Sequence, residues 1–173
     1  MPLLSRQDII QLFESLNDEL RQDEINGELY LVGGAVMCLA FQSRPSTRDI
    51  DALFVPANEV RLAAGKVARK MDIDIDWLND AVKGYLSPEG EFDLFLELDH
   101  LRVLIAQPEY LLAMKCLAMR IGEEYHDEDD IRYLLRYLNI ESYSKAIEII
   151  SAYYPSEQFP QKTLYALEEL LQK

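Results

Sequence analysis

Cysteine and histidine are both scarce in this chain of 173 residues, with two of each. Cys38 and Cys116 are too few for a disulfide framework or an all-cysteine zinc site. Both lie among apolar residues, so we expect buried packing residues rather than nucleophiles. His100 and His126 are far apart in the sequence, which favours surface or structural roles over a histidine metal site.

Basic residues are also in the minority, with 17 Lys and Arg against 31 Asp and Glu and a formal net charge of −14. This excess of acid argues against a general nucleic-acid coat protein, because phosphate binding draws on Lys and Arg. It leaves room for a small basic site. No run approaches the roughly 18 consecutive apolar residues of a membrane span, and the first residues lack the apolar core of a signal peptide. We therefore expect a cytoplasmic protein without a membrane partner.

The chain does have the composition of a folded globular protein, with 49% hydrophobic and 28% charged residues. Helical spacing predicts helices over 5–21, 35–41, 58–70, 109–120, 127–138, 142–154 and 161–171. Ser5 and Asp8 are placed to cap the first of these, Asn58 can cap the third, and Pro108 is placed as a first helical residue. Short apolar or alternating runs predict strands over 29–32, 49–54, 92–96 and 101–105. We expect an α+β protein, with an α/β domain over 1–107 and a helical region over 108–173 packed on it.

The stretch 29–54 combines residue types that suggest phosphate chemistry. A short strand ends at Gly33 and Gly34, whose lack of side chains lets a phosphate approach the backbone at the start of a helix. Further along, Asp49 and Asp51 open a strand, where residues two apart point to the same side. Two adjacent carboxylates can share a hard cation such as Mg²⁺, which would neutralise the phosphates of a nucleotide.

Each of these features also has a simpler explanation. A Gly-Gly pair after a strand is commonly a turn, and Asp-x-Asp is commonly a solvated strand end. The segment from Arg44 to Lys70 has six basic residues against three acidic ones, which suits a phosphate-bearing ligand. A helix face with scattered salt bridges would explain that local charge equally well.

The order of these motifs resembles the nucleotidyltransferase superfamily, in which a Gly-Gly turn precedes an acidic pair on the next strand. In the fuller pattern, over about 29–138, the chain is similar to bacterial nucleotidyltransferase-like proteins related to the AbiEii toxin family. The matching residues are Gly33 and Gly34, then Arg44, Ser46, Thr47, Asp49 and Asp51, then Lys115 and Arg120, and finally Asp127 and Asp130.

The resemblance implies a nucleotidyltransferase-like mixed β-sheet flanked by helices and followed by a C-terminal helical bundle. It implies that Asp49 and Asp51 hold Mg²⁺ or Mn²⁺ in a catalytic site. Gly33, Gly34, Ser46, Arg48 and Lys115 would bind the nucleoside triphosphate, with Lys115 at its phosphate tail. Asp130 would be an acidic partner in the helical part.

Three points of the pattern remain open. Active members of the superfamily commonly use a third carboxylate, for which Asp93 has the expected apolar neighbours, while Asp76 and Asp99 fit less well. Lys115 could instead extend to solvent from an amphipathic helix. Six of the eight residues over 123–130 are acidic, and a solvated face or a helix N-terminus would explain most of them.

The leading hypothesis is an enzyme that binds NTP and Mg²⁺ and transfers a nucleotidyl group to an RNA or protein acceptor. It would act within a toxin–antitoxin or abortive-infection system, with a cognate antitoxin as partner. The alternative is a catalytically inactive protein of the same fold that acts as an interaction module. A purely structural helical adaptor is the third reading, and it leaves the spacing of the motifs unexplained. The sequence leaves the nucleotide, the acceptor and the oligomeric state open.

Overall fold

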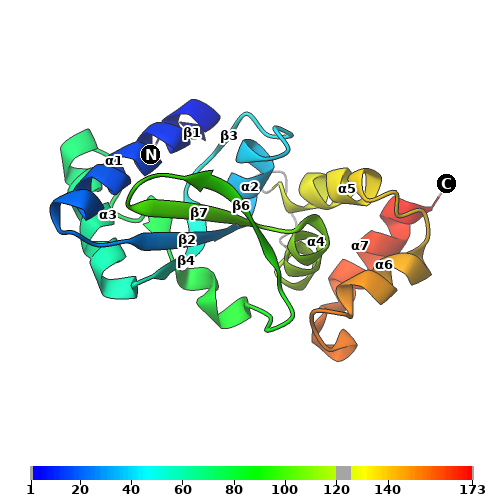
Figure 1. The fold of residues 1–173 in the computed structure, drawn as a ribbon. Helices are drawn as coiled ribbons and strands as arrows, with labels where there is room; N and C mark the ends of the chain where they lie inside the picture. The colour runs from blue at the N-terminus through cyan, green and yellow to red at the C-terminus, as the bar shows by residue number, and fades with distance from the viewer. Residues whose placement is uncertain (1, 120–125, 173) are drawn as a thin grey trace. The chain divides into compact units, whose positions relative to one another are not determined.

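The structure is a computed structural model that describes residues 2–119 and 126–172. Over these residues the protein is α+β, with seven α-helices, a mixed five-stranded sheet and a separate two-stranded sheet. The chain divides into two compact units (Figure 1). The first unit consists of Met1–Gly84 and Phe92–Ala106, and the second of Tyr85–Glu91 and Gln107–Lys173.

The first unit is built around the five-stranded sheet, whose strand order is β5-β4-β2-β7-β6. Its strands are β2 (Gly27–Val32), β4 (Ile50–Val55), β5 (Leu78–Asn79), β6 (Phe92–Glu97) and β7 (Leu101–Ala106). The two-stranded sheet pairs β1 (Leu4–Ser5) with β3 (Ser46–Thr47). The helices are α1 (Arg6–Gln22), α2 (Gly34–Leu39), α3 (Ala57–Met71) and the 3₁₀ helix η1 (Ala81–Tyr85). Strand β2 runs antiparallel to β4 and parallel to β7, so the sheet is mixed.

The two faces of this sheet differ in character, because successive side chains of a strand point to opposite sides. One face is apolar and buried, and α1 and α3 pack on it (Figure 1). Its buried residues are Leu29, Leu31, Ile50, Ala52, Phe54, Leu101 and Val103. The other face, which we call the outer face, carries side chains that are more often polar or partly exposed. Its residues are Glu28, Tyr30, Val32, Asp51, Leu53, Val55, Asn79, Phe92, Leu94, Glu97, Arg102, Leu104 and Ala106.

The starts of α1 and α4 agree with the sequence predictions, and the start of α3 does not. Ser5 caps α1 in a capping box with Asp8, as predicted. The prediction that Asn58 caps the third helix is wrong, because α3 begins earlier and its cap is Pro56. Asn58 lies inside the first turn, where its Oδ1 accepts a hydrogen bond from Arg61 at 3.3 Å. Pro108 is the first residue of α4, as predicted.

The second unit is helical in its described part. It contains α4 (Pro108–Leu117), α5 (Asp127–Tyr137), α6 (Tyr143–Ile150), the 3₁₀ helix η2 (Ser156–Gln158) and α7 (Gln161–Leu171). The helix predicted over 109–120 ends earlier, at Leu117, and Arg120 lies outside the described residues.

The short segment Tyr85–Glu91 belongs to this second unit through hydrogen bonds to its helical part. The Ser87 amide donates to Tyr110 Oη at 2.9 Å, and Ser87 Oγ donates to the Tyr153 carbonyl at 2.6 Å. Tyr154 Oη donates to the carbonyl of Tyr85 at 2.5 Å. The second unit is therefore assembled from two separate parts of the chain.

Several smaller predictions concern burial. Cys38 and Cys116 are buried, as predicted. Trp77 is fully buried and donates from Nε1 to the Ala64 carbonyl at 3.0 Å, so it serves the core rather than stacking on a ligand. No described helix is long and apolar enough to cross a membrane.

Candidate phosphate and metal site

The glycine turn lies at the end of β2, beside the acidic strand. Gly33 is the N-cap of α2 with φ of 73° and ψ of −155°, a backbone conformation that favours glycine. A Cβ atom built on Gly33 would lie 3.0 Å from Asp51 Oδ2. The missing side chain at Gly33 therefore lets the carboxylate of Asp51 pack directly against the turn.

The second glycine of the turn meets the loop that precedes β4. Where Gly34 would carry a Cβ atom, the guanidinium of Arg44 takes the space, with Nη1 as the nearest atom. Thr47 Oγ1 lies 3.1 Å from the same point. Arg44 and Thr47 thus close over the turn, and a side chain larger than hydrogen at position 34 would displace Arg44.

The two carboxylates of the acidic pair lie at the start of β4. Asp49 immediately precedes the strand and Asp51 is its second residue, paired with Val32 of β2 and Asn79 of β5. Asn79 Nδ2 donates to Asp49 Oδ2 at 3.2 Å, which orients this carboxylate. Both aspartates are partly exposed. The structure therefore brings Asp51 to Gly33, and Asn79, the strand neighbour of Asp51, holds the carboxylate of Asp49.

The chemistry of this donor set fits a magnesium ion. Mg²⁺ prefers oxygen ligands and is commonly bound by one or two carboxylates together with the phosphates of a substrate. Asp51 supplies one such carboxylate directly beside the glycine turn, and Asp49, held by Asn79, supplies a second at the start of the same strand. Among the described residues, no group of three or more His, Cys, Asp or Glu side chains is arranged to hold a metal ion by itself.

Ser46 and Arg48, the two loop residues predicted to bind the nucleotide, do not lie at the glycine turn. Ser46 precedes Thr47 in β3, and neighbouring residues of a strand point in opposite directions. Because Thr47 faces the glycine turn, Ser46 points away from it. Arg48 is exposed to solvent. Arg44 and Thr47 lie at the glycine turn, where the prediction placed Ser46 and Arg48. Both belong to the segment that resembles the nucleotidyltransferase-like proteins.

Asp93, the predicted third carboxylate, is not brought to the acidic pair. It lies in the edge strand β6, where it pairs with Ile105 of β7. Ile105 pairs in turn with Leu31, a buried residue of the helix-covered face, so Asp93 shares that face while Asp51 lies on the outer face. The register therefore places Asp93 on the opposite side of the sheet from Asp51.

The two weaker candidates for a third carboxylate, Asp99 and Asp76, make other contacts. Asp99 accepts hydrogen bonds from Arg21 Nε and Asn17 Nδ2, at 2.9 and 2.7 Å. The bond from Arg21 and then that from Asn17 hold the pKa of Asp99 well below its ordinary value. Asp76 is exposed in the turn before Trp77, and its amide donates to Asp74 Oδ1 at 2.8 Å.

Lys115 lies in the second unit and forms a buried ionic cluster with Asp127 and Asp130. Its Nζ is 2.8 Å from Asp130 Oδ2 and 3.1 Å from Asp127 Oδ1, and the lysine side chain is 8% exposed. The alternative that Lys115 extends to solvent is therefore wrong. The solvated-face explanation fails for Asp127 and Asp130, which are buried. It holds for Glu128 and Asp129, which are exposed.

Three of the four basic residues of α3 are used in surface ion pairs. Arg61 binds Asp80 at 2.6 Å, Lys66 binds Asp23 at 3.3 Å and Lys70 binds Glu19 at 2.8 Å. The structure thus favours the salt-bridge explanation of the local positive charge over a basic rim for a ligand. Arg44, at the glycine turn, is the basic residue of this segment placed beside the candidate site.

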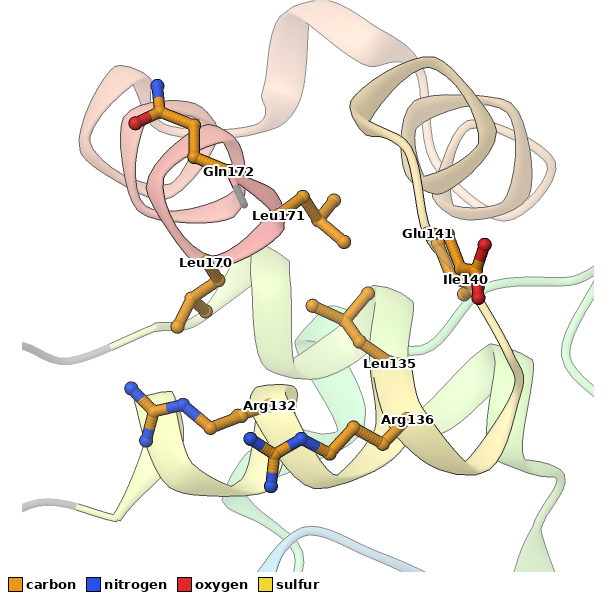
Figure 2. A pocket seen from close by; sticks show the side chains of 8 residues that line it. All are labelled: Arg132, Leu135, Arg136, Ile140, Glu141, Leu170, Leu171 and Gln172. Atoms are coloured by element: carbon orange, nitrogen blue, oxygen red, sulfur yellow. The ribbon is translucent and has the colours of Figure 1, made fainter.

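A separate pocket lies in the second unit between α5 and α7 (Figure 2). Leu135 and Leu171 point toward each other across it, and Arg132 and Arg136 extend side by side from α5 (Figure 2). Its volume of about 180 Å³ is below the roughly 300–1,000 Å³ of small-molecule sites. It is therefore smaller than a typical nucleotide site.

Comparison of the chain with known protein families, with curated proteins and with solved structures gave no match. The membership of the nucleotidyltransferase superfamily accordingly stays a prediction from the motifs.

Proposed function

We propose that the first unit is a nucleotidyltransferase-like domain that binds a nucleoside triphosphate with Mg²⁺ or Mn²⁺, and that the helices of the second unit form the accompanying C-terminal bundle. The observation that carries the proposal is the contact between Gly33 and Asp51. It places a backbone turn without side chains directly beside a carboxylate of the acidic pair. This is the arrangement that phosphate binding next to a metal requires.

In this proposal each residue of the site has a definite task. Asp49 and Asp51 supply the oxygens that hold the metal ion, and Asn79 orients Asp49. The absence of side chains at Gly33 and Gly34 lets Asp51 and Arg44 come close to the turn, and the guanidinium of Arg44 lies where it can meet the negative charge of the phosphates. When bound, the metal stabilises the charge that develops in an in-line displacement at phosphorus.

The proposed reaction transfers a nucleotidyl group to an RNA or protein acceptor. A bond forms between an acceptor oxygen and the α-phosphorus, and the bond to the β-phosphate breaks, releasing pyrophosphate. In line with the resemblance, we propose a place in a toxin–antitoxin or abortive-infection system.

Titration calorimetry tests nucleotide binding. We expect the wild-type chain to bind at least one of the four NTPs with Mg²⁺, and Asp49→Asn/Asp51→Asn to bind at least about tenfold more weakly. Glu168→Gln/Glu169→Gln is the matched control, because it removes two exposed acids from α7 in the second unit. Undiminished binding by the Asp49/Asp51 variant would remove the basis of the proposal.

A labelling experiment tests the reaction separately. The chain is incubated with cell RNA and protein and with NTP labelled at the α- or the γ-phosphate. Nucleotidyl transfer predicts a labelled acceptor with the α-label alone. Absence of any labelled product would reject transfer and leave nucleotide binding standing.

A second function is favoured by the composition of the outer face. Among the described strand residues, the only other carboxylates that share this face with Asp51 are Glu28 and Glu97. Both are bound to Arg102, at 3.0 and 3.6 Å. Without a third carboxylate at the pair, the domain would act as a catalytically inactive interaction module whose charge of −14 complements a basic partner. Affinity capture that yields no stoichiometric partner would count against this function.

A further inference from the structure

We infer that the outer face of the sheet binds a nucleobase beside the phosphate site, on the aromatic pair Tyr30 and Phe92. The inference rests on the proposed function, since it places the base of a ligand whose phosphates lie at Gly33 and Asp51. It adds residues that none of the nucleotide motifs contains.

The register of the strands orders the outer face in three successive rows. The first row has Asp51 beside Val32, next to the glycine turn, and Ala106 beside Phe92 on the next two strands. The second has Leu53, Tyr30, Leu104 and Leu94, each paired with the next across four strands. The third has Val55, Glu28, Arg102 and Glu97, paired in the same way. Moving away from the turn across these rows, the face carries first Asp51, then Tyr30 among leucines, and then the ionic side chains of the third row.

Tyr30 of the middle row, with Phe92 of the first row beside it, supplies a surface on which a planar ring can stack. The rings of Tyr30 and Phe92 meet edge to face, with centroids 5.2 Å apart and an interplanar angle of 81°. An edge-to-face contact covers at most one face of the Tyr30 ring, so the other face of Tyr30 lies outside this contact. Both residues are partly exposed, and the neighbouring Leu94 is 48% exposed. An apolar, partly exposed aromatic surface of this kind suits a nucleobase, because every base has a π-face.

The third row supplies polar groups at the far side of the rings. Arg102 Nη1 donates to Glu28 Oε2 at 3.0 Å, and its Nε is 3.6 Å from Glu97 Oε1. Burial and then the charge of Glu28 raise the pKa of Tyr30, so its hydroxyl stays protonated at neutral pH. Donors and acceptors of this kind can pair with the hydrogen-bonding edge of a base.

The order of the rows matches the order of groups in a nucleotide. Successive residues on one face of a strand are about 7 Å apart. The row that contains Tyr30 therefore lies one such step from Asp51. Phosphates at the glycine turn would leave the base over Tyr30 and its polar edge toward Glu28 and Arg102. The base could belong to the bound NTP or to a single-stranded acceptor, and both present the same ring to the same surface.

The test compares Tyr30→Ala with wild type in calorimetry against three probes: Mg·NTP, Mg·tripolyphosphate and a single-stranded RNA oligonucleotide. Loss of stacking predicts about tenfold weaker binding of Mg·NTP and unchanged binding of tripolyphosphate, which has no base. Tyr30→Phe keeps the ring and should retain the affinity. Tyr165→Ala, which removes a 64% exposed tyrosine from α7, is the matched control.

The outcomes separate this inference from the proposed function. If wild type binds neither Mg·NTP nor tripolyphosphate, the proposed function fails and the inference fails with it. If wild type binds Mg·NTP and Tyr30→Ala binds all three probes equally well, only the aromatic platform is refuted. Equal losses for NTP and tripolyphosphate also refute it, because the effect would not depend on a base. A loss confined to the oligonucleotide supports the platform and assigns the base to the acceptor.

Discussion

The buried cluster of Lys115, Asp127 and Asp130 gives the sharpest prediction for stability. Lys115→Met removes the positive charge of the lysine from beside the two buried carboxylates of Asp127 and Asp130. With contacts of 2.8 and 3.1 Å, each attraction is on the order of 5 kcal/mol at an effective dielectric constant of about 20, before desolvation is subtracted. Breaking such a buried pair costs about 3–5 kcal/mol. We expect the free energy of unfolding to fall by that amount.

Urea unfolding at constant pH measures the effect with two signals. Far-UV circular dichroism reports helices of both units, whereas the fluorescence of the single tryptophan, Trp77, reports the first unit. Since Lys115 lies in the second unit, the loss should appear in the dichroism signal. The control Lys145→Met breaks an exposed pair with Glu148 at 3.4 Å, which is worth less than about 1 kcal/mol.

A rescue variant distinguishes charge from packing. Lys115→Met/Asp127→Asn/Asp130→Asn removes all three charges while keeping their approximate shapes, and should recover more than half of the lost stability. If Lys115→Met costs no more than Lys145→Met, or if the triple variant recovers nothing, the cluster does not act as a buried ionic network.

Three further predictions concern side chains around glycines and cysteines. Gly90→Ala should lower stability by about 1–3 kcal/mol in thermal unfolding, because its Cβ would overlap the fully buried ring of Tyr110. Gly84→Ala, with open space at its Cβ, should be nearly neutral. Gly34→Ala displaces the flexible end of Arg44, so calorimetry should show weaker Mg·NTP binding while thermal stability changes by less than about 1 kcal/mol. Burial raises the pKa of Cys116 to about 12 and also raises that of Cys38, so neither thiol should react rapidly with a thiol reagent at pH 8 until the chain unfolds; fast labelling of the native chain would contradict this.

Local signals allowed much of the fold to be predicted from the sequence. The capping box of Ser5 and Asp8 and the first-turn position of Pro108 depend on residues within one turn of helix, and both predictions are confirmed. The predicted helix over 161–171 coincides with α7. Asn58 misled the prediction because its side chain is a good cap in isolation, whereas Pro56 already fixes the start of α3.

The candidate site could be predicted only as far as the motif is local. Gly33 and Asp51 meet because β2 and β4 are adjacent strands, and the motif spacing already implied such a pairing. The side of the sheet to which Asp93 points depends on its pairing with Ile105, and a shift of one residue would reverse it. The partners of Lys115 lie twelve and fifteen residues further along the chain, so their contact depends on helix packing that periodicity does not reveal.

The division of the second unit into two stretches of chain has a consequence for synthesis on the ribosome. All residues of the first unit have been made once Ala106 is added, so its sheet can form early. Tyr85 and Ser87, made before that point, must wait until Tyr153 and Tyr154 leave the exit tunnel to find their partners. During that interval Tyr85–Glu91 is joined to the sheet of the first unit, while the helices that it binds are still being made. Cleavage of the chain after Ala106 would separate Tyr85–Glu91 from Tyr153 and Tyr154, to which it is hydrogen-bonded.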